Sequence, residues 1–136
     1  MRLPDIVRLI LAAIFFIGAI ANTAMAIFAP SVYESFADMA FVPAYRDWWH
    51  ELVYPNIHLF LIPVILLELA IAGLLLRSGV YVKYSLLIAL LFDLFLVPFW
   101  WQGGAIANLL LALPLAWLLR DPYPLTILAI LRGGGS

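Results

Sequence analysis

Two carboxylates stand in the middle of long apolar runs, and they are the residues of this chain best suited to chemistry. Glu68 and Asp93 each interrupt a stretch of aliphatic and aromatic side chains. A charged side chain at the centre of a bilayer costs about 2.5–3.5 kcal/mol on insertion scales, so such residues are candidate functional groups. No basic residue is expected at their depth, so they cannot both be ordinary ion pairs. They are the candidate catalytic residues.

Three further polar residues lie within apolar runs: Asn22, His58 and Asn108. Together with Glu68 and Asp93 they are predicted to line one ligand-binding site for a membrane lipid or apolar small molecule. The alternative is structural, with the carboxyls and amides acting as polar clamps that set helix register. In this alternative, His58 makes hydrogen bonds at the membrane interface.

Depth along the predicted helices supports a shared site. Glu68 lies nine residues before Arg77, and Asp93 lies ten residues after Lys83. At about 1.5 Å per residue, both carboxyls are expected about 13–15 Å from the same membrane edge, near the midplane. Asn22 and Asn108 are expected to share a depth in the outer half.

Composition then decides the class of protein. Of 136 residues, 67% are hydrophobic and 11% are charged. The mean hydropathy is +1.12, too apolar for the surface of a soluble domain. A net charge of −1 argues against a basic surface that would bind nucleic acid. There is no cysteine and there are only two histidines, so no metal site and no cofactor is expected.

Four apolar runs predict an all-α membrane protein, a four-helix bundle in one domain over residues 1–132. The spans are expected at about 4–28, 56–76, 84–101 and 105–119, and residues 133–136 resemble an appended linker. Residues 43–54, between the first two spans, mix charges with aromatic side chains. This pattern predicts a short amphipathic helix at the outer face, either an interfacial anchor or a lid over the bundle.

Positive charge predicts the orientation. If both termini share one side, that side receives Arg2, Arg8 (expected to snorkel), Arg77, Lys83, Arg120 and Arg132, and the other receives Arg46. Both termini are therefore expected in the cytoplasm, with the chain crossing a prokaryotic-type inner membrane several times.

The segment 68–79 resembles the second-span signature of the DoxX-like family of small four-helix membrane proteins. It shows a Glu, a Gly one turn later, a leucine run and a glycine turn, and residues 16–22 are also similar. The resemblance implies an accessory membrane subunit, in some relatives linked to quinone-coupled redox. A weaker likeness is to the sterol-isomerase and sigma-2-receptor group, in which acidic residues face an internal cavity.

Three functions remain open at this point. The first is a DoxX-like accessory protein that binds a lipid or small apolar molecule at an intramembrane acidic site. The second is a membrane enzyme in which Glu68 or Asp93 transfers a proton, as an isomerase or a quinone-coupled redox subunit. The third is a purely structural subunit of a homo-oligomer or larger membrane complex, or a small transporter.

Overall fold

The computed structural model describes residues 1–99, 101 and 104–133. Within these ranges the chain is helical and has no strand, which confirms the all-α prediction. Four helices are long: α1 (Leu3–Phe28), α3 (Ile57–Leu75), α4 (Val80–Leu96) and α5 (Ala105–Leu118). Two are short: α2 (Pro43–Trp48) and α6 (Ile127–Leu131). The helices that satisfy the length and hydropathy of a membrane span are Leu3–Phe28 and the continuous run Pro43–Leu75.

Proline and glycine explain most of the helix ends. Pro4 lies in the first turn of α1, where its missing N–H costs nothing. Pro30 follows the end of α1 directly and begins a 3₁₀ helix, Pro30–Met39. Gly79, with φ of 61°, makes the left-handed turn from which α4 begins.

The third span differs from its prediction. It was expected at 84–101, whereas α4 runs from Val80 to Leu96. The helix starts earlier because Lys83 folds back to donate a hydrogen bond to the Leu119 carbonyl, so its charge does not prevent a helical start. It ends at Leu96 because Pro98 has no N–H with which to continue the helical hydrogen bonds. Part of the expected range lies outside the described residues.

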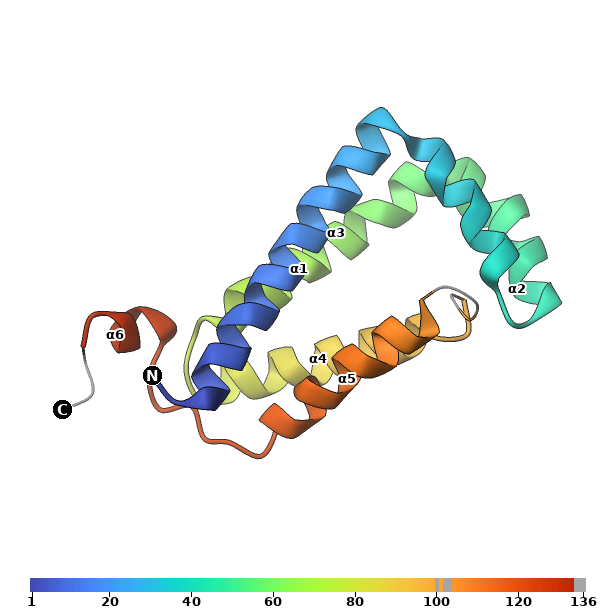
Figure 1. The fold of residues 1–136 in the computed structure, drawn as a ribbon. Coiled ribbons are helices and arrows are strands. Elements are labelled where there is room, and N and C mark those ends of the chain that lie inside the picture. Colours follow the sequence, from blue (N-terminus) through green and yellow to red (C-terminus); the bar gives the residue numbers. More distant parts are fainter. Residues whose placement is uncertain (100, 102–103, 134–136) are drawn as a thin grey trace.

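Residues 30–56 form a segment that we call the cap. It contains the 3₁₀ helix Pro30–Met39, α2, a π-helical turn at Trp49–Val53 and a 3₁₀ turn at Tyr54–Asn56 that leads into α3. A helix is therefore present within residues 43–54, as predicted. In Figure 1 the cap lies at the end of the molecule opposite the two termini.

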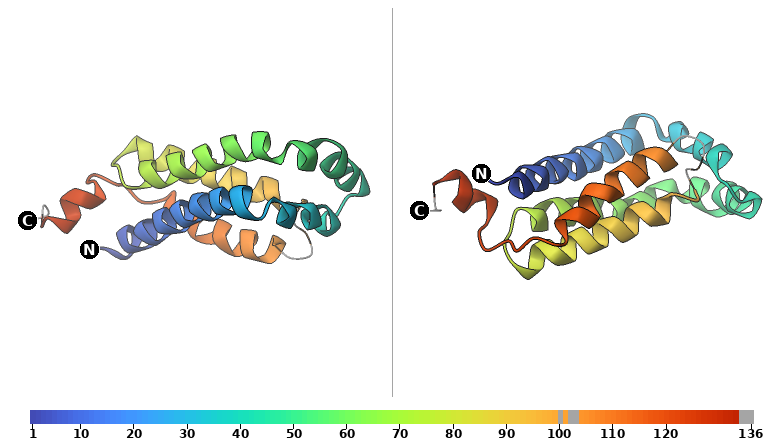
Figure 2. Two further views of the ribbon diagram at one scale, coloured as in Figure 1. Left: turned by 90° about the horizontal axis from the view of Figure 1, so that it is seen from above. Right: turned by 60° about the horizontal axis from the view of Figure 1, so that its bottom comes forward.

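The long helices are arranged as two antiparallel pairs (Figures 1 and 2). Helix α1 packs along α3, and α4 packs along α5. Helices α3 and α4 connect the pairs, whereas α1 and α5 touch only slightly. In Figure 1 the pairs meet near the termini, which we call the terminal end, and are spread apart at the capped end.

Two hydrophobic clusters follow from this arrangement. The larger draws residues from all four long helices and Tyr123: Leu11, Ala12, Phe15, Ile71, Ala72, Leu75, Val82, Leu86, Ala89, Leu115, Leu118 and Tyr123. The smaller joins the cap to α3: Tyr33, Val53, Ile57 and Leu61. The large core therefore lies toward the terminal end, and the small one lies under the cap.

Tyr123 fastens the terminal end. Its side chain is 2% exposed, and its hydroxyl donates to the Leu118 carbonyl at 2.7 Å. Its ring lies 4.9 Å from the Arg8 guanidinium carbon and 5.5 Å from Lys83 Nζ. Arg8 is fully buried there instead of snorkelling, and donates to the Leu125 carbonyl at 3.4 Å. One tyrosine thus contacts both helix pairs.

Candidate functional site

Glu68 of α3 lies against two residues of α1, Asn22 and Gly18. Asn22 Nδ2 donates to Glu68 Oε2 at 2.9 Å. A Cβ placed on Gly18, one turn before Asn22, would lie 2.8 Å from Glu68 Oε1. Because glycine has no side chain, the carboxyl of α3 reaches the backbone of α1 at this point.

The hydrogen bonds continue from Asn22 into the cap. The Tyr33 hydroxyl donates to Asn22 Oδ1 at 2.8 Å, and Trp49 Nε1 donates to the Tyr33 carbonyl at 2.8 Å. Burial, and then the nearby Glu68, raises the pKa of Tyr33 to about 12. Sequence reasoning did not single out Tyr33, since nothing in its spacing indicates a bond to Asn22.

Asp93 has a different environment. Its side chain lies in α4 and is 3% exposed, yet Oδ2 has no hydrogen-bond partner within residues 1–99, 101 and 104–133. Asn108 Nδ2, on α5, is also buried without a partner in this part of the chain. Asp93 lies three residues before the end of α4, and Asn108 lies three residues after the start of α5. Because these helices are antiparallel neighbours, the two side chains occupy the same level.

The helix bounds overturn the expected equal depth of the two carboxyls. Glu68 lies seven residues from the terminal end of α3, and Asp93 lies thirteen residues from the terminal end of α4. At 1.5 Å per residue these separations are about 10 and about 20 Å. Glu68 pairs with Asn22, which was instead expected to match Asn108. No hydrogen bond or ion pair joins Glu68 to Asp93 in the described structure.

His58 does not join either carboxyl. It is exposed near the start of α3, ten residues before Glu68. Among the described residues, no group of three His, Asp or Glu side chains is placed to hold a metal ion. The five predicted site residues therefore separate into the hydrogen-bonded pair Asn22–Glu68, the two unpartnered groups Asp93 and Asn108 at similar distances from facing helix ends, and an isolated histidine.

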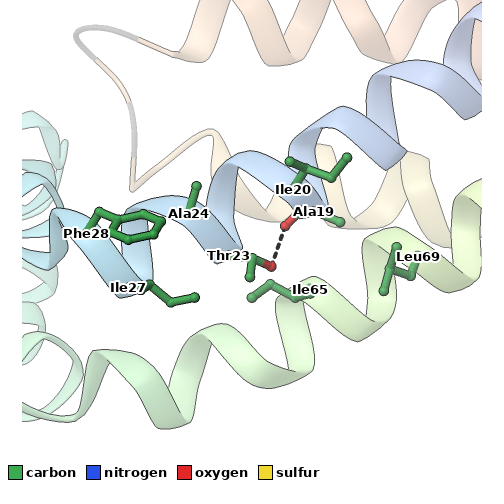
Figure 3. Close-up of a pocket in the computed structure, with 8 residues that line it drawn as sticks. All are labelled: Ala19, Ile20, Thr23, Ala24, Ile27, Phe28, Ile65 and Leu69. Carbon is green, nitrogen blue, oxygen red and sulfur yellow. Dashed lines mark hydrogen bonds between the residues drawn. The ribbon is translucent and has the colours of Figure 1, made fainter.

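An apolar groove of about 340 Å³ runs between α1 and α3. Figure 3 shows its lining: Ala19, Ile20, Thr23, Ala24, Ile27, Phe28, Ile65 and Leu69. The Thr23 hydroxyl is turned to the Ala19 carbonyl at 2.7 Å, so it offers no free donor to the groove. Neither Glu68 nor Asp93 lines this groove.

The two acid–amide pairs differ in what they can do chemically. Glu68 accepts a hydrogen bond from Asn22, whose own oxygen is occupied by Tyr33. Hydrogen bonds of this kind join helices. Asp93 and Asn108 hold an acceptor and a donor with no described partner. More than about 90% of buried polar groups in native proteins are bonded, so this pair has capacity left for a further molecule.

No family model, curated protein or solved structure matches the chain. The resemblance of segment 68–79 to DoxX-like proteins therefore stays a prediction. Function has to be inferred from the side chains described above.

Proposed function

We propose that this chain is a multi-pass protein of the cytoplasmic membrane. Helices α1, α3, α4 and α5 cross the membrane in this proposal, and both termini lie in the cytoplasm. Each of these helices turns large apolar side chains outward, with exposed fractions of 62% at Ile17, 60% at Leu66, 59% at Leu91 and 61% at Leu110. In water such surfaces associate. Helix α5, of 14 residues, is about 21 Å long, so the bilayer would have to thin beside it or the neighbouring turns complete the crossing.

Within that membrane protein, we propose that Asp93 and Asn108 bind a lipid or small apolar molecule. The observation that carries the proposal is the buried Asp93 Oδ2 without a partner. A buried polar group left unsatisfied costs about 1–3 kcal/mol, and more if it is charged. A ligand group that donates to Asp93 and accepts from Asn108, such as a hydroxyl, would remove both costs at once.

Glu68 has a structural role in this proposal. Its bond to Asn22 and its fit against Gly18 hold α1 to α3. This arrangement corresponds to the polar clamp considered from the sequence. The proposed ligand site therefore has fewer residues than the five-residue site predicted from the sequence, and it lies in the α4–α5 pair.

The second candidate function is a membrane enzyme in which Asp93 donates or accepts a proton. The same open carboxyl favours it, because a catalytic acid must be free to reach its substrate. A DoxX-like accessory protein of an oxidoreductase complex is compatible with either function. Binding is the simpler proposal, since it needs only the two side chains already described.

The test compares what co-purifies with matched variants. Wild type, Asp93→Asn, Asn108→Leu and Glu68→Gln are purified in a mild detergent and examined by native mass spectrometry. We expect one bound species in wild type and Glu68→Gln, and its loss in Asp93→Asn and Asn108→Leu. Loss of the bound species from Glu68→Gln with the fold intact would mean that Glu68 belongs to the ligand site. Absence of any bound molecule from all four forms would favour a structural subunit.

A further inference from the structure

We propose that the cap is a lid, hinged on the α1–α3 pair and closing over the level of Asp93 and Asn108. This inference rests on the proposed function, because it describes access to that same site. It follows from a difference in how the cap is attached to the two helix pairs.

The cap is joined to α1 and α3 by covalent continuity and by hydrogen bonds. Its two ends continue directly from α1 and into α3. Inside it, Trp49 Nε1 bonds the Tyr33 carbonyl, and the Tyr33 hydroxyl bonds Asn22 of α1, which in turn bonds Glu68 of α3. Tyr33 is 2% exposed. This side of the cap is therefore fixed.

The cap meets the α4–α5 side chiefly through rings. Tyr45 stacks on Phe99 with centroids 4.6 Å apart, and Trp48 lies 6.0 Å from the same ring. Phe41 lies 5.0 Å from the Trp101 ring, and its N–H donates to the Pro98 carbonyl at 3.0 Å. No ion pair joins the cap to this side in the described residues.

Ring contacts of this kind can separate and re-form without leaving a buried charge, and only one backbone bond would be exchanged for water. Phe99 and Pro98 follow the last turn of α4, the turn that carries Asp93. Asp93 lies three residues before the end of α4, about 4.5 Å along its axis. Figure 1 shows the cap across the end where the two helix pairs are spread apart. Lifting the ring contacts would open this end while the hinge stays bonded.

The absence of cysteine from the chain allows a direct test of access. Asn108→Cys is introduced alone and together with Phe99→Ala, and the labelling rate by a small maleimide is measured in detergent micelles. We expect Phe99→Ala to raise the rate at position 108 by at least tenfold. Phe28→Ala is the matched control, because Phe28 lies at the same end, is 82% exposed, and should leave the rate unchanged.

A second reporter separates lid opening from unfolding. Leu86→Cys lies in the large core and has no exposed surface. Its labelling should stay slow in the Phe99→Ala background. Equal acceleration at both positions, or a change below twofold at position 108, would overturn the lid.

The labelling readout needs no ligand, so the two proposals fail separately. Fast labelling in Phe99→Ala without any co-purified molecule would support the lid and reject the ligand site. A co-purified molecule that depends on Asp93, together with an unchanged labelling rate, would support the site and reject the lid.

Discussion

In the middle of their apolar runs the α1–α3 pair and the α4–α5 pair each carry one carboxyl and one asparagine, but only the first pair brings its two groups into a hydrogen bond. Asn22 reaches Glu68 at 2.9 Å, whereas Asp93 Oδ2 and Asn108 Nδ2 have no partner within the described residues. The same residue types therefore serve different ends in neighbouring pairs. Residue type alone does not distinguish a clamp from a binding site, and the neighbours of each carboxyl decide.

Two neighbours explain the closed state of the first pair. Gly18 leaves room for the Glu68 carboxyl beside the α1 backbone, and Tyr33 occupies the second polar atom of Asn22. Small residues allow such close approach and cross-helix bonding in membrane bundles.

The asparagines give the sharpest contrast. Asn22→Leu should lower the free energy of unfolding by about 1–3 kcal/mol, because it leaves Glu68 buried without its donor. Asn108→Leu removes a donor that is already unpartnered, so it should be neutral or stabilising in ligand-free protein. Denaturation in mixed detergent micelles measures both. Equal losses in the two variants would remove the distinction between the pairs.

Glycine substitutions test the close approach. Gly18→Ala places a methyl group where the Glu68 carboxyl lies, and overpacking of this kind costs about 1–3 kcal/mol, less the better helix propensity of alanine, about 1 kcal/mol. Gly73→Ala is the matched control in α3, since nothing lies within 4 Å of its added Cβ. We expect a lower melting temperature for the first variant and an equal or higher one for the second. The reverse order would contradict the clamp.

Removing one hydroxyl tests the link between the cap and the clamp. Tyr33→Phe deletes the bond to Asn22 Oδ1 and should cost about 0.5–1.5 kcal/mol. Tyr81→Phe, at a side chain that is 57% exposed, should leave stability unchanged. Thermal unfolding of the two variants in the same detergent gives the comparison. If Tyr33→Phe unfolds at the wild-type temperature, the hydroxyl contributes nothing to the clamp.

Alkaline pH should weaken the same link. The phenol of Tyr33 has its pKa raised to about 12 in the folded chain by burial, against about 10 for a free tyrosine. The unfolded state therefore loses this proton first, so the contribution is complete below about pH 10 and is lost as pH rises through 12. Unfolding measured across this range should show a shallower decline in Tyr33→Phe. Identical slopes in both proteins would contradict this assignment.

Much of the fold could be predicted from apolar runs and their breakers. The first, second and fourth spans begin and end within about one residue of α1, α3 and α5. The third was misplaced because Lys83 was taken as part of a turn, whereas a distant carbonyl, that of Leu119, receives its ammonium group. Local sequence carries no information on such a partner.

The candidate residues could be named from the sequence, but the contacts between them could not. Polar residues within apolar runs identified Glu68, Asp93, Asn22 and Asn108. Which of them meet depends on helix starts and on rotation about the helix axis, and the start of α4 was wrong by four residues, about 6 Å. Tyr33 was missed as a partner because a hydroxyl in an aromatic-rich segment has no distinctive spacing.

The contacts of Tyr123 at the terminal end form late in the synthesis of the chain. The residues that fasten α1, α4 and the α3–α4 turn together belong to the segment translated after all four long helices. Until it emerges from the ribosome, the Arg8 guanidinium has neither the Tyr123 ring nor the Leu125 carbonyl as a partner. By then the contacts between α3 and α4 and the core shared by the four long helices can already join the two pairs, so this last segment adds the partners of Arg8 and Lys83. We therefore expect the burial of Arg8 to be completed last.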